Sequence, residues 1–396
     1  MTARWRVITL LVLAAILVAG GIPYAQAPDS IKIGFMAPYV GVYTKLGQDM
    51  DKGFKLYLDE VGWKAGGRKI EMIKSDTEGK PSLGPTKVRE LVEKDKVDLL
   101  SGIVHSGVAY SIRDYVDEKK IPLILTNAGA PKLTAEKKSP YIFRISFANG
   151  QHDLAGGWYA YNKLGLRKMA VLAPDYSAGH DKAKGFMKYF KAAGGKIVKE
   201  IYPPMGTQDF APYLAEIRKI AKEIDGTWAF FSGSMCIRFI TQYDEYGLGK
   251  QAPLFVIGDT VDDAFLPSMR NAALGVKNYT HYALTLDNPE NKKFVEAYLK
   301  KYKEDPSMFS EQGYVGAKVI VDALSAINGK VEDKDAFLAA VKQAKFNAPR
   351  GPFKFDKNQN VVENIYIRRV EKVGGKLRNV VTDVIKDVDQ NWKPPK

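Results

Sequence analysis

Residues 123–134 read LILTNAGAPKLT. Three large aliphatic residues at positions 123–125 run directly into the small and polar stretch at positions 126–130. An apolar run that ends in such residues predicts a buried strand followed by a turn. Two interpretations of the turn remain: it is an ordinary connection, or its bare backbone packs against something other than protein. The flanking sequence, which sets the fold, helps to choose between them.

Short apolar runs alternate with amphipathic stretches on the N-terminal side of this turn. Strands are predicted at residues 31–36, 69–75, 98–104 and 122–126, and helices at residues 50–61, 86–95 and 108–116. The strands are too uniformly apolar to have one face in water. We therefore expect a parallel sheet that is covered by helices.

The same alternation restarts at residue 168. Strands are predicted at residues 169–173, 196–201, 227–231 and 254–257, and helices at residues 183–190, 210–220 and between the last two strands. A further helix is predicted at residues 315–327, and a hairpin at residues 365–370 and 377–385 that turns at Gly374 and Gly375. These patterns predict the α/β class, with two doubly wound parallel-sheet lobes.

The first residues have the pattern of a secretory signal peptide. Arg4 and Arg6 precede an apolar run at residues 7–22, and Ala25 and Ala27 supply the small residues of a cleavage site. The alternative, a membrane anchor, needs about 20 apolar residues, whereas this run is shorter and ends in glycines and a proline. We expect export to the periplasm, with residues 1–27 removed by cleavage after Ala27.

The net charge of +14 does not by itself indicate a nucleic-acid partner. Lysines are mixed with acidic residues, as at residues 49–55 and 90–98, and no arginine-rich block or basic–aromatic motif occurs. Cys236 is the only cysteine, so no intramolecular disulfide can form. An exported chain without disulfides depends on its hydrophobic cores, which favours a bacterial periplasm.

The sequence contains no recognisable catalytic or cofactor-binding motif. Its four histidines, His105, His152, His180 and His281, are far apart and form no metal-binding pair. Cys236 has no base near it in the sequence, and neither a nucleophile elbow nor a phosphate- or dinucleotide-binding loop is present. We therefore predict no metal, no cofactor and no enzymatic activity, although residues distant in sequence could still meet.

Small, polar or aromatic residues follow five of the predicted strands. They lie at residues 105–107, 127–129, 175–177, 232–234 and 258–260. In open α/β sheets, ligands bind outside the carboxyl ends of the parallel strands. Several of these loops precede a helix, whose N-terminal N–H groups suit a carboxylate, and Ser106 adds a hydroxyl donor. Each loop alone is more typical of a helix cap or a turn, but five at one sheet edge favour a ligand site.

The order and spacing of four segments resemble a known family. The segments are IKIGFMAP at residues 31–38, the block at residues 75–102 that begins SDTEGKPSLGP, APDYSAGHDKAKGF at residues 173–186 and GPFKFDKNQN at residues 351–360. The chain resembles the type I periplasmic solute-binding proteins of ABC transporters, of the leucine/isoleucine/valine-binding kind. The resemblance implies a monomer that buries a small-molecule solute by hinge closure and delivers it to a membrane permease.

The resemblance also implies a hinge in which the chain crosses between the lobes three times. The crossings are expected near residues 146–149, 277–282 and 350–355. Lobe 1 then comprises residues 28–146 and 280–350, and lobe 2 comprises residues 147–279 and 351–396.

The same resemblance places the ligand-binding residues on the strand-end loops. His105 and Ser106 match the first ligand loop, and Asn127, Ala128 and Gly129 match the second. Tyr176 matches the aromatic residue of the second lobe, Asp259 the acid that receives an amino group, and Leu46 with Tyr43 the apolar wall. Ser234 stands where the family has an aromatic residue.

Two departures from the family pattern concern the ligand. Gly129 stands where a hydroxyl normally helps to hold an α-amino acid, and Ser234 replaces an aromatic side chain. The extra room, together with His105 and Asn127, suits a bulkier ligand with a phenolic or keto group, such as an aromatic carboxylate. We expect a small carboxylate-bearing solute, either an aromatic carboxylate or an amino acid. Two other functions stay open: a soluble periplasmic sensor domain that reports the same ligand to a membrane receptor, and a hydrolase.

Overall fold

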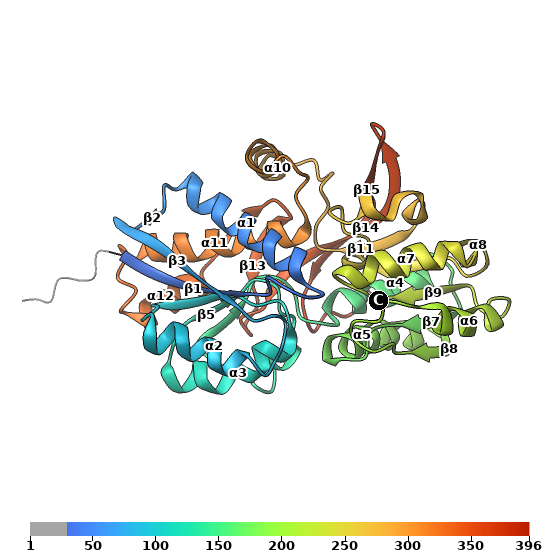
Figure 1. Cartoon of the computed structure of the whole chain (residues 1–396), viewed down its shortest axis with the longest axis horizontal. Helices are drawn as coiled ribbons and strands as arrows, with labels where there is room; N and C mark the ends of the chain where they lie inside the picture. The colour runs from blue at the N-terminus through green and yellow to red at the C-terminus, as the bar shows by residue number, and fades with distance from the viewer. Residues whose placement is uncertain (1–29, 396) are drawn as a thin grey trace, which may run out of the picture.

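Two β-sheets organise the chain, which forms two lobes that lie side by side (Figure 1). The computed structural model describes residues 30–395, so the predicted signal peptide lies outside the described residues. No helix within residues 30–395 combines the length and the apolar character that crossing a membrane requires. The predicted α/β class with two parallel-dominated sheets is confirmed.

The first sheet has six strands in the order β2-β3-β1-β4-β5-β6. Its strands are β1 (Ser30–Ala37), β2 (Lys64–Ala65), β3 (Arg68–Asp76), β4 (Leu99–Gly102), β5 (Leu123–Leu125) and β6 (Ile142–Arg144). All pairs are parallel except the edge pair of β2 with β3. The helices between these strands are α1 (Thr44–Glu60), α2 (Gly84–Arg89), which continues as one π-helical turn (Glu90–Lys94), and α3 (Ser106–Lys119). Because β4 and β5 are buried at every position, helices must cover both of their faces.

The second sheet has nine strands, and β15 pairs with β14 beside the order β12-β13-β14-β11-β10-β9-β7-β8. Its strands are β7 (Lys168–Leu172), β8 (Lys196–Ile201), β9 (Gly226–Ala229), β10 (Leu254–Ile257), β11 (Lys277–Thr280), β12 (Lys345–Ala348), β13 (Gly351–Phe355), β14 (Val361–Val373) and β15 (Lys376–Val388). Its helices are α4 (Gln151–Asn162), α5 (Ser177–Ala192), α6 (Ala211–Ile220), α7 (Ser234–Glu245), α8 (Leu248–Gln251) and α9 (Leu266–Met269). Strands β7 to β11 pair in parallel, and the rest of the sheet is antiparallel.

Three late helices follow β11 along the chain: α10 (Pro289–Tyr302), α11 (Met308–Ala326) and α12 (Lys334–Lys342). Helix α11 returns to the first lobe and lies against α1 (Figure 1). The two backbones approach closely at Gly53 and Gly313, where a Cβ atom would lie about 2 Å from a carbonyl oxygen of the other helix. The C-terminal part of the chain therefore completes the lobe that the N-terminal part begins.

The predicted C-terminal hairpin is present as β14 and β15. Gly374 and Gly375 both have positive φ angles, of 56° and 80°, as the tight turns favoured between twisted strands require. Strand β11 was not indicated by the sequence because its residues are not uniformly apolar. Its Asn278 is fully buried and accepts a hydrogen bond from Arg368 Nε at 2.7 Å, so a polar residue occupies a core position.

In each sheet, the strand order reverses at the first parallel strand, because later strands are added on both of its sides. In the first sheet, β3 and β4 flank β1, and in the second, β8 and β9 flank β7. Loops that leave adjacent strands at such a point diverge and leave a crevice at the carboxyl ends, where α/β proteins bind their ligands. The two crevices face each other across the boundary between the lobes.

Candidate functional site

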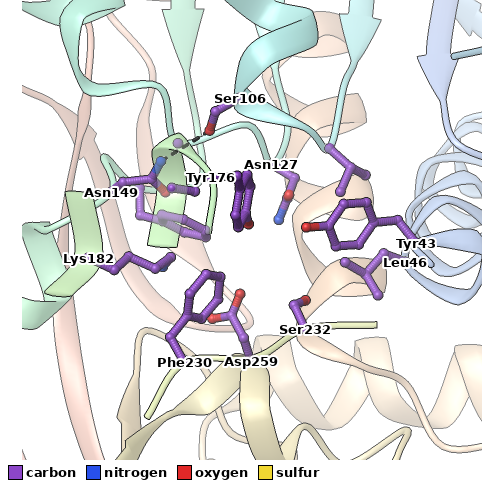
Figure 2. Close-up of a pocket in the computed structure, with 14 residues that line it drawn as sticks. Tyr43, Leu46, Ser106, Asn127, Asn149, Tyr176, Lys182, Phe230, Ser232 and Asp259 are labelled. Carbon is purple, nitrogen blue, oxygen red and sulfur yellow. Dashed lines mark hydrogen bonds between the residues drawn. The ribbon is translucent and has the colours of Figure 1, made fainter. Parts of the chain in front are cut away.

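A cavity lies between the lobes, and about 320 Å³ of space in and around it, including open solvent, is free of protein atoms. Figure 2 shows side chains from both lobes converging on it. The lining residues are Tyr43, Leu46, Val104, Ser106, Asn127, Gly129, Phe147, Asn149, Tyr176, Ala178, Lys182, Phe230, Ser232 and Asp259. Four aromatic rings and three aliphatic side chains stand beside polar groups in the wall, and small-molecule sites commonly combine such groups.

The lining residues come from the loops and helix starts that follow strands of both sheets. The first lobe contributes the segments after β1, β4 and β5, and the second contributes those after β7, β9 and β10. The segment after β6 passes from one lobe to the other and adds Phe147 and Asn149. The cavity therefore lies between the crevices at the switch points of the two sheets.

The structure brings most of the residues expected from the sequence to this one cavity. Tyr43, Leu46, Ser106, Asn127, Gly129, Tyr176 and Asp259 all line it. His105, Ala128 and Ser234 do not line it, and each has another structural place.

His105 caps helix α3. Its Nδ1 accepts a hydrogen bond from the backbone N–H of Gly107 at 3.0 Å, and burial lowers the pKa of His105 to about 4. The imidazole is therefore neutral at pH 7 and can accept this bond. Its ring lies 5.2 Å from the ring of Tyr176 and 6.1 Å from that of Tyr43, centroid to centroid. His105 thus supports two lining tyrosines from behind.

Ala128 and Ser234 hold backbone positions. Ala128 is fully buried among the hydrophobic residues of the first lobe, and its N–H donates to Ile103 O at 2.9 Å. The N–H of Ser234 donates to Val42 O at 3.1 Å, which joins the second lobe to the opening loop of the first. At the neighbouring Gly233, a Cβ would lie 2.1 Å from the same carbonyl. The lobes therefore touch across the cavity in a closed arrangement.

Seven lining residues were not expected from the sequence: Val104, Phe147, Asn149, Ala178, Lys182, Phe230 and Ser232. Most of them adjoin segments that the sequence singled out, since Ser232 belongs to a strand-end loop and Phe147 to the first crossing. Phe230 supplies an aromatic ring on the segment after β9, where Ser234 had suggested that none remains. Lys182 lies in the second turn of α5, and no local pattern distinguishes it from the many surface lysines.

Two charged side chains face the cavity, Lys182 and Asp259 (Figure 2). Burial raises the pKa of Asp259, against the opposing effect of the positive charges of Lys182 and Arg368. Neither Asp259 Oδ2 nor Lys182 Nζ has a hydrogen-bond partner among residues 30–395. The Ser232 hydroxyl is likewise unpaired within that range. The cavity thus presents one cation, one carboxylate and a hydroxyl to whatever it encloses.

On the first-lobe side, Asn149 and Ser106 form a linked pair. The Asn149 amide donates to Ser106 Oγ at 3.1 Å (Figure 2), and the backbone N–H of Asn149 donates to Gly129 O at 2.7 Å. A Cβ atom on residue 129 would lie 2.2 Å from Asn149 Oδ1 and 2.9 Å from a ring carbon of Phe147. A larger residue at this position would force one or both of these lining side chains to shift.

Asp153, at the start of α4, is a buried carboxylate close to the cavity. The Tyr279 hydroxyl donates to its Oδ1 at 2.7 Å, and its Oδ2 has no partner within residues 30–395. Burial raises the pKa of Asp153 to about 6, although the charge of Lys182 and the bond from Tyr279 act to lower it. A carboxyl whose pKa is higher in the folded than in the unfolded chain costs stability as the pH rises from about 4 to about 6.

Asp153→Asn is therefore expected to stabilise the protein at high pH only. The variant should match the wild type near pH 4 and exceed its free energy of unfolding by about 2–3 kcal/mol at pH 8. Urea denaturation at several pH values measures the difference, with Asp114→Asn on an exposed face of α3 as the control. A difference that does not grow with pH would contradict the assigned cost of ionising Asp153.

Behind the cavity, Arg350 forms a buried ionic cluster that joins the segments passing between the lobes. Its Nε and Nη2 donate to the two oxygens of Glu311 at 2.8 and 2.5 Å. Its Nη1 donates to Glu363 Oε2 at 3.2 Å and to Ile145 O at 2.9 Å. Although burial opposes its charge, the two carboxylates raise the pKa of Arg350. One side chain thus connects α11, β14 and the segment after β6.

His152, His281 and Glu363 extend this cluster. Their ligand-type atoms all lie within 4.8 Å of one another, so histidines that are far apart in sequence do meet. The nitrogen and carboxylate donors are of a kind that transition metals bind. However, Glu363 already accepts bonds from His152 Nε2, at 2.8 Å, and from Arg350. Because the guanidinium supplies the positive charge, we assign the cluster to the hinge and not to a metal.

The fold and the cavity together define a class of protein. The chain forms two doubly wound α/β lobes, and a small cavity lies between them where the two switch points face each other. This arrangement is that of a bilobal solute-binding protein. The cavity has the mixed aromatic and polar lining of a small-molecule site, and both lobes contribute to its wall.

Comparison with known proteins identifies the family. A model described as "Periplasmic binding protein" matches residues 30–376. The Leu/Ile/Val-binding protein homolog 6 of Brucella melitensis is 32% identical over 371 residues, which cover 92% of this chain and 93% of the relative. The chain therefore belongs to the periplasmic binding protein family, as its sequence predicted.

Solved structures of similar proteins support the same family assignment. The ABC transporter substrate-binding protein from Sphaerobacter thermophilus is 41% identical, with a TM-score of 0.86 over 91% of this chain and 99% of that chain. A solute-binding protein of an ABC transporter from R. palustris, solved in complex with benzoate, is 36% identical, with a TM-score of 0.85 over 90% of this chain and 98% of that chain.

Proposed function

We propose that this protein is the substrate-binding component of an ABC transporter and that it captures an aromatic carboxylate between its lobes. The observation that carries the proposal is the cavity, which is enclosed by the rings of Tyr43, Phe147, Tyr176 and Phe230 and faced by a single cation, Lys182. Aromatic rings pack well against another ring in offset or edge-to-face geometry. The benzoate ligand of the R. palustris relative has this chemistry.

An amino acid is the competing ligand, as the name of the Brucella melitensis relative suggests. Asp259 would then receive its ammonium group. Two features favour the aromatic acid. The positive charges of Lys182 and Arg368 offset part of the cost of burying Asp259, and Gly129 provides no hydroxyl.

The remaining parts of the proposal follow from the family. The protein is exported by its first 27 residues to the periplasm, acts as a monomer without catalysis, and hands its ligand to a membrane permease. Lobe 1 (residues 28–146 and 280–350) and lobe 2 (residues 147–279 and 351–396) rotate about the hinge and close on the ligand, a population shift that the permease can recognise. The bond from Ser234 N–H to Val42 O, which joins the two lobes, supports a closed arrangement.

The test is a ligand panel measured by thermal shift and by calorimetry. Benzoate and 4-hydroxybenzoate are expected to raise the melting temperature, since a ligand at 100 times its Kd adds about 2.7 kcal/mol of stability. Leucine and isoleucine are expected to have no effect, and acetate, a carboxylate without a ring, serves as the control. Stabilisation by leucine alone would contradict the aromatic assignment.

A further inference from the structure

Lys182 is an unusual lysine because its charged end is buried at the cavity. The residue is 2% exposed and reaches the cavity from helix α5 (Figure 2). Its Nζ lies 4.3 Å from the ring centroid of Phe147 and 5.0 Å from that of Phe230. These two rings hold the ammonium group by cation–π attraction and fix where it points.

The two rings do not accept conventional hydrogen bonds from the N–H groups of the ammonium. An ammonium has three N–H donors, and Lys182 Nζ makes no hydrogen bond to any residue in the described part of the chain. A buried charge without hydrogen bonds is costly. An anion in the cavity removes this cost because it accepts those donors, and so the lysine selects for an anionic group.

Among residues 30–395, the first lobe places no cation on the cavity wall to meet that anionic group. Gly129 has no hydroxyl, and the Ser106 hydroxyl, which accepts a bond from the Asn149 amide, has a single uncharged donor of its own. We propose that Lys182, on the second lobe, is the residue that binds the carboxylate of the ligand and sets the preference for acids. This inference rests on the proposed function, since it concerns the ligand of the same cavity.

The alternative is that Lys182 only balances buried acids. Its charge does act on Asp153, Asp259 and Glu363, whose pKa values it lowers against the larger effect of burial. However, none of these carboxylates accepts a hydrogen bond from Nζ within residues 30–395. A lysine that served only as their counter-ion would be expected to pair with one of them. The position of Nζ at the cavity wall favours the ligand.

The experiment compares an acid with its neutral amide. Calorimetry of wild type and Lys182→Met with benzoate and with benzamide separates the carboxylate from the ring. Lys182→Met is expected to weaken benzoate binding by roughly 10- to 100-fold, the range for a hydrogen bond to a charged group. Benzamide binding should change less than about threefold, because its uncharged amide gains little from the ammonium. Lys184→Met, two residues along the same helix and exposed, is the matched control.

Each outcome decides a different point. If Lys182→Met binds benzoate as tightly as the wild type, or loses benzoate and benzamide equally, the role of Lys182 is overturned while the proposed function stands. If the wild type binds leucine and not benzoate, the aromatic assignment fails, and leucine with leucinamide repeats the Lys182 comparison. Binding of neither acid contradicts both proposals. Circular dichroism and thermal unfolding of Lys182→Met show whether the variant is folded at the temperature of the titration, which separates a binding defect from misfolding.

Discussion

Arg350→Met is expected to lower the free energy of unfolding by about 3–5 kcal/mol, the range for removing one partner of a buried ion pair. The loss is large because the substitution leaves the carboxylates of Glu311 and Glu363 buried without their cation. It also removes the bond to Ile145 O, in the segment after β6. Urea denaturation followed by circular dichroism at pH 7 measures the change.

Two further variants locate the cause. Arg113→Met removes a surface arginine that pairs with the exposed Asp114 and also donates to the backbone carbonyls of Lys137 and Lys138. Surface ion pairs of this kind contribute about 0–1 kcal/mol. Adding Glu311→Gln to Arg350→Met is expected to recover part of the loss, since one unpaired buried charge is then gone. If Arg350→Met costs no more than Arg113→Met, the cluster does not hold the hinge together.

The parts of the fold that the sequence predicted are those in which local pattern and packing agree. Strands such as β5 and β10 are apolar throughout and buried throughout, so hydrophobicity alone locates them. Strand β11 escaped prediction because Asn278 occupies a core position and is satisfied by Arg368, 90 residues away in the chain. A partner so distant in sequence leaves no local signal.

The site residues likewise fall into those that the sequence predicted and those that only the fold reveals. Ser106, Tyr176 and Asp259 follow strand ends, and strand ends are visible in the sequence as the points where apolar runs stop, whereas Tyr43 was expected only from the family resemblance. Lys182 lies inside a helix among other lysines, and only the fold reveals that it is buried between two rings. The hinge cluster around Arg350 joins residues from three distant segments, so it too depends on the tertiary structure.

Gly129→Ser restores a hydroxyl where related proteins are expected to have one, yet we expect it to weaken binding of aromatic acids by about 10- to 100-fold. The new Cβ would lie 2.2 Å from Asn149 Oδ1 and 2.9 Å from the ring of Phe147, so both lining side chains must move. Overpacking of this kind costs about 1–3 kcal/mol, and each 1.4 kcal/mol is about tenfold in affinity. Displacing Asn149 also breaks its bond to Ser106. Calorimetry with benzoate measures the loss.

The control for this change is Gly249→Ser, at an exposed site where a Cβ meets nothing within 4 Å. It should leave benzoate affinity unchanged, because it adds the same side chain without displacing a cavity residue. The informative contrast is leucine. If packing sets the ligand class, Gly129→Ser loses benzoate and gains no leucine. A gain in leucine affinity would mean that the missing hydroxyl alone separates the two ligands, and that Asn149 and Phe147 can move aside for it. The small residues of LILTNAGAPKLT would then determine which ligand binds, and their role would not be to make room for the side chains of Asn149 and Phe147.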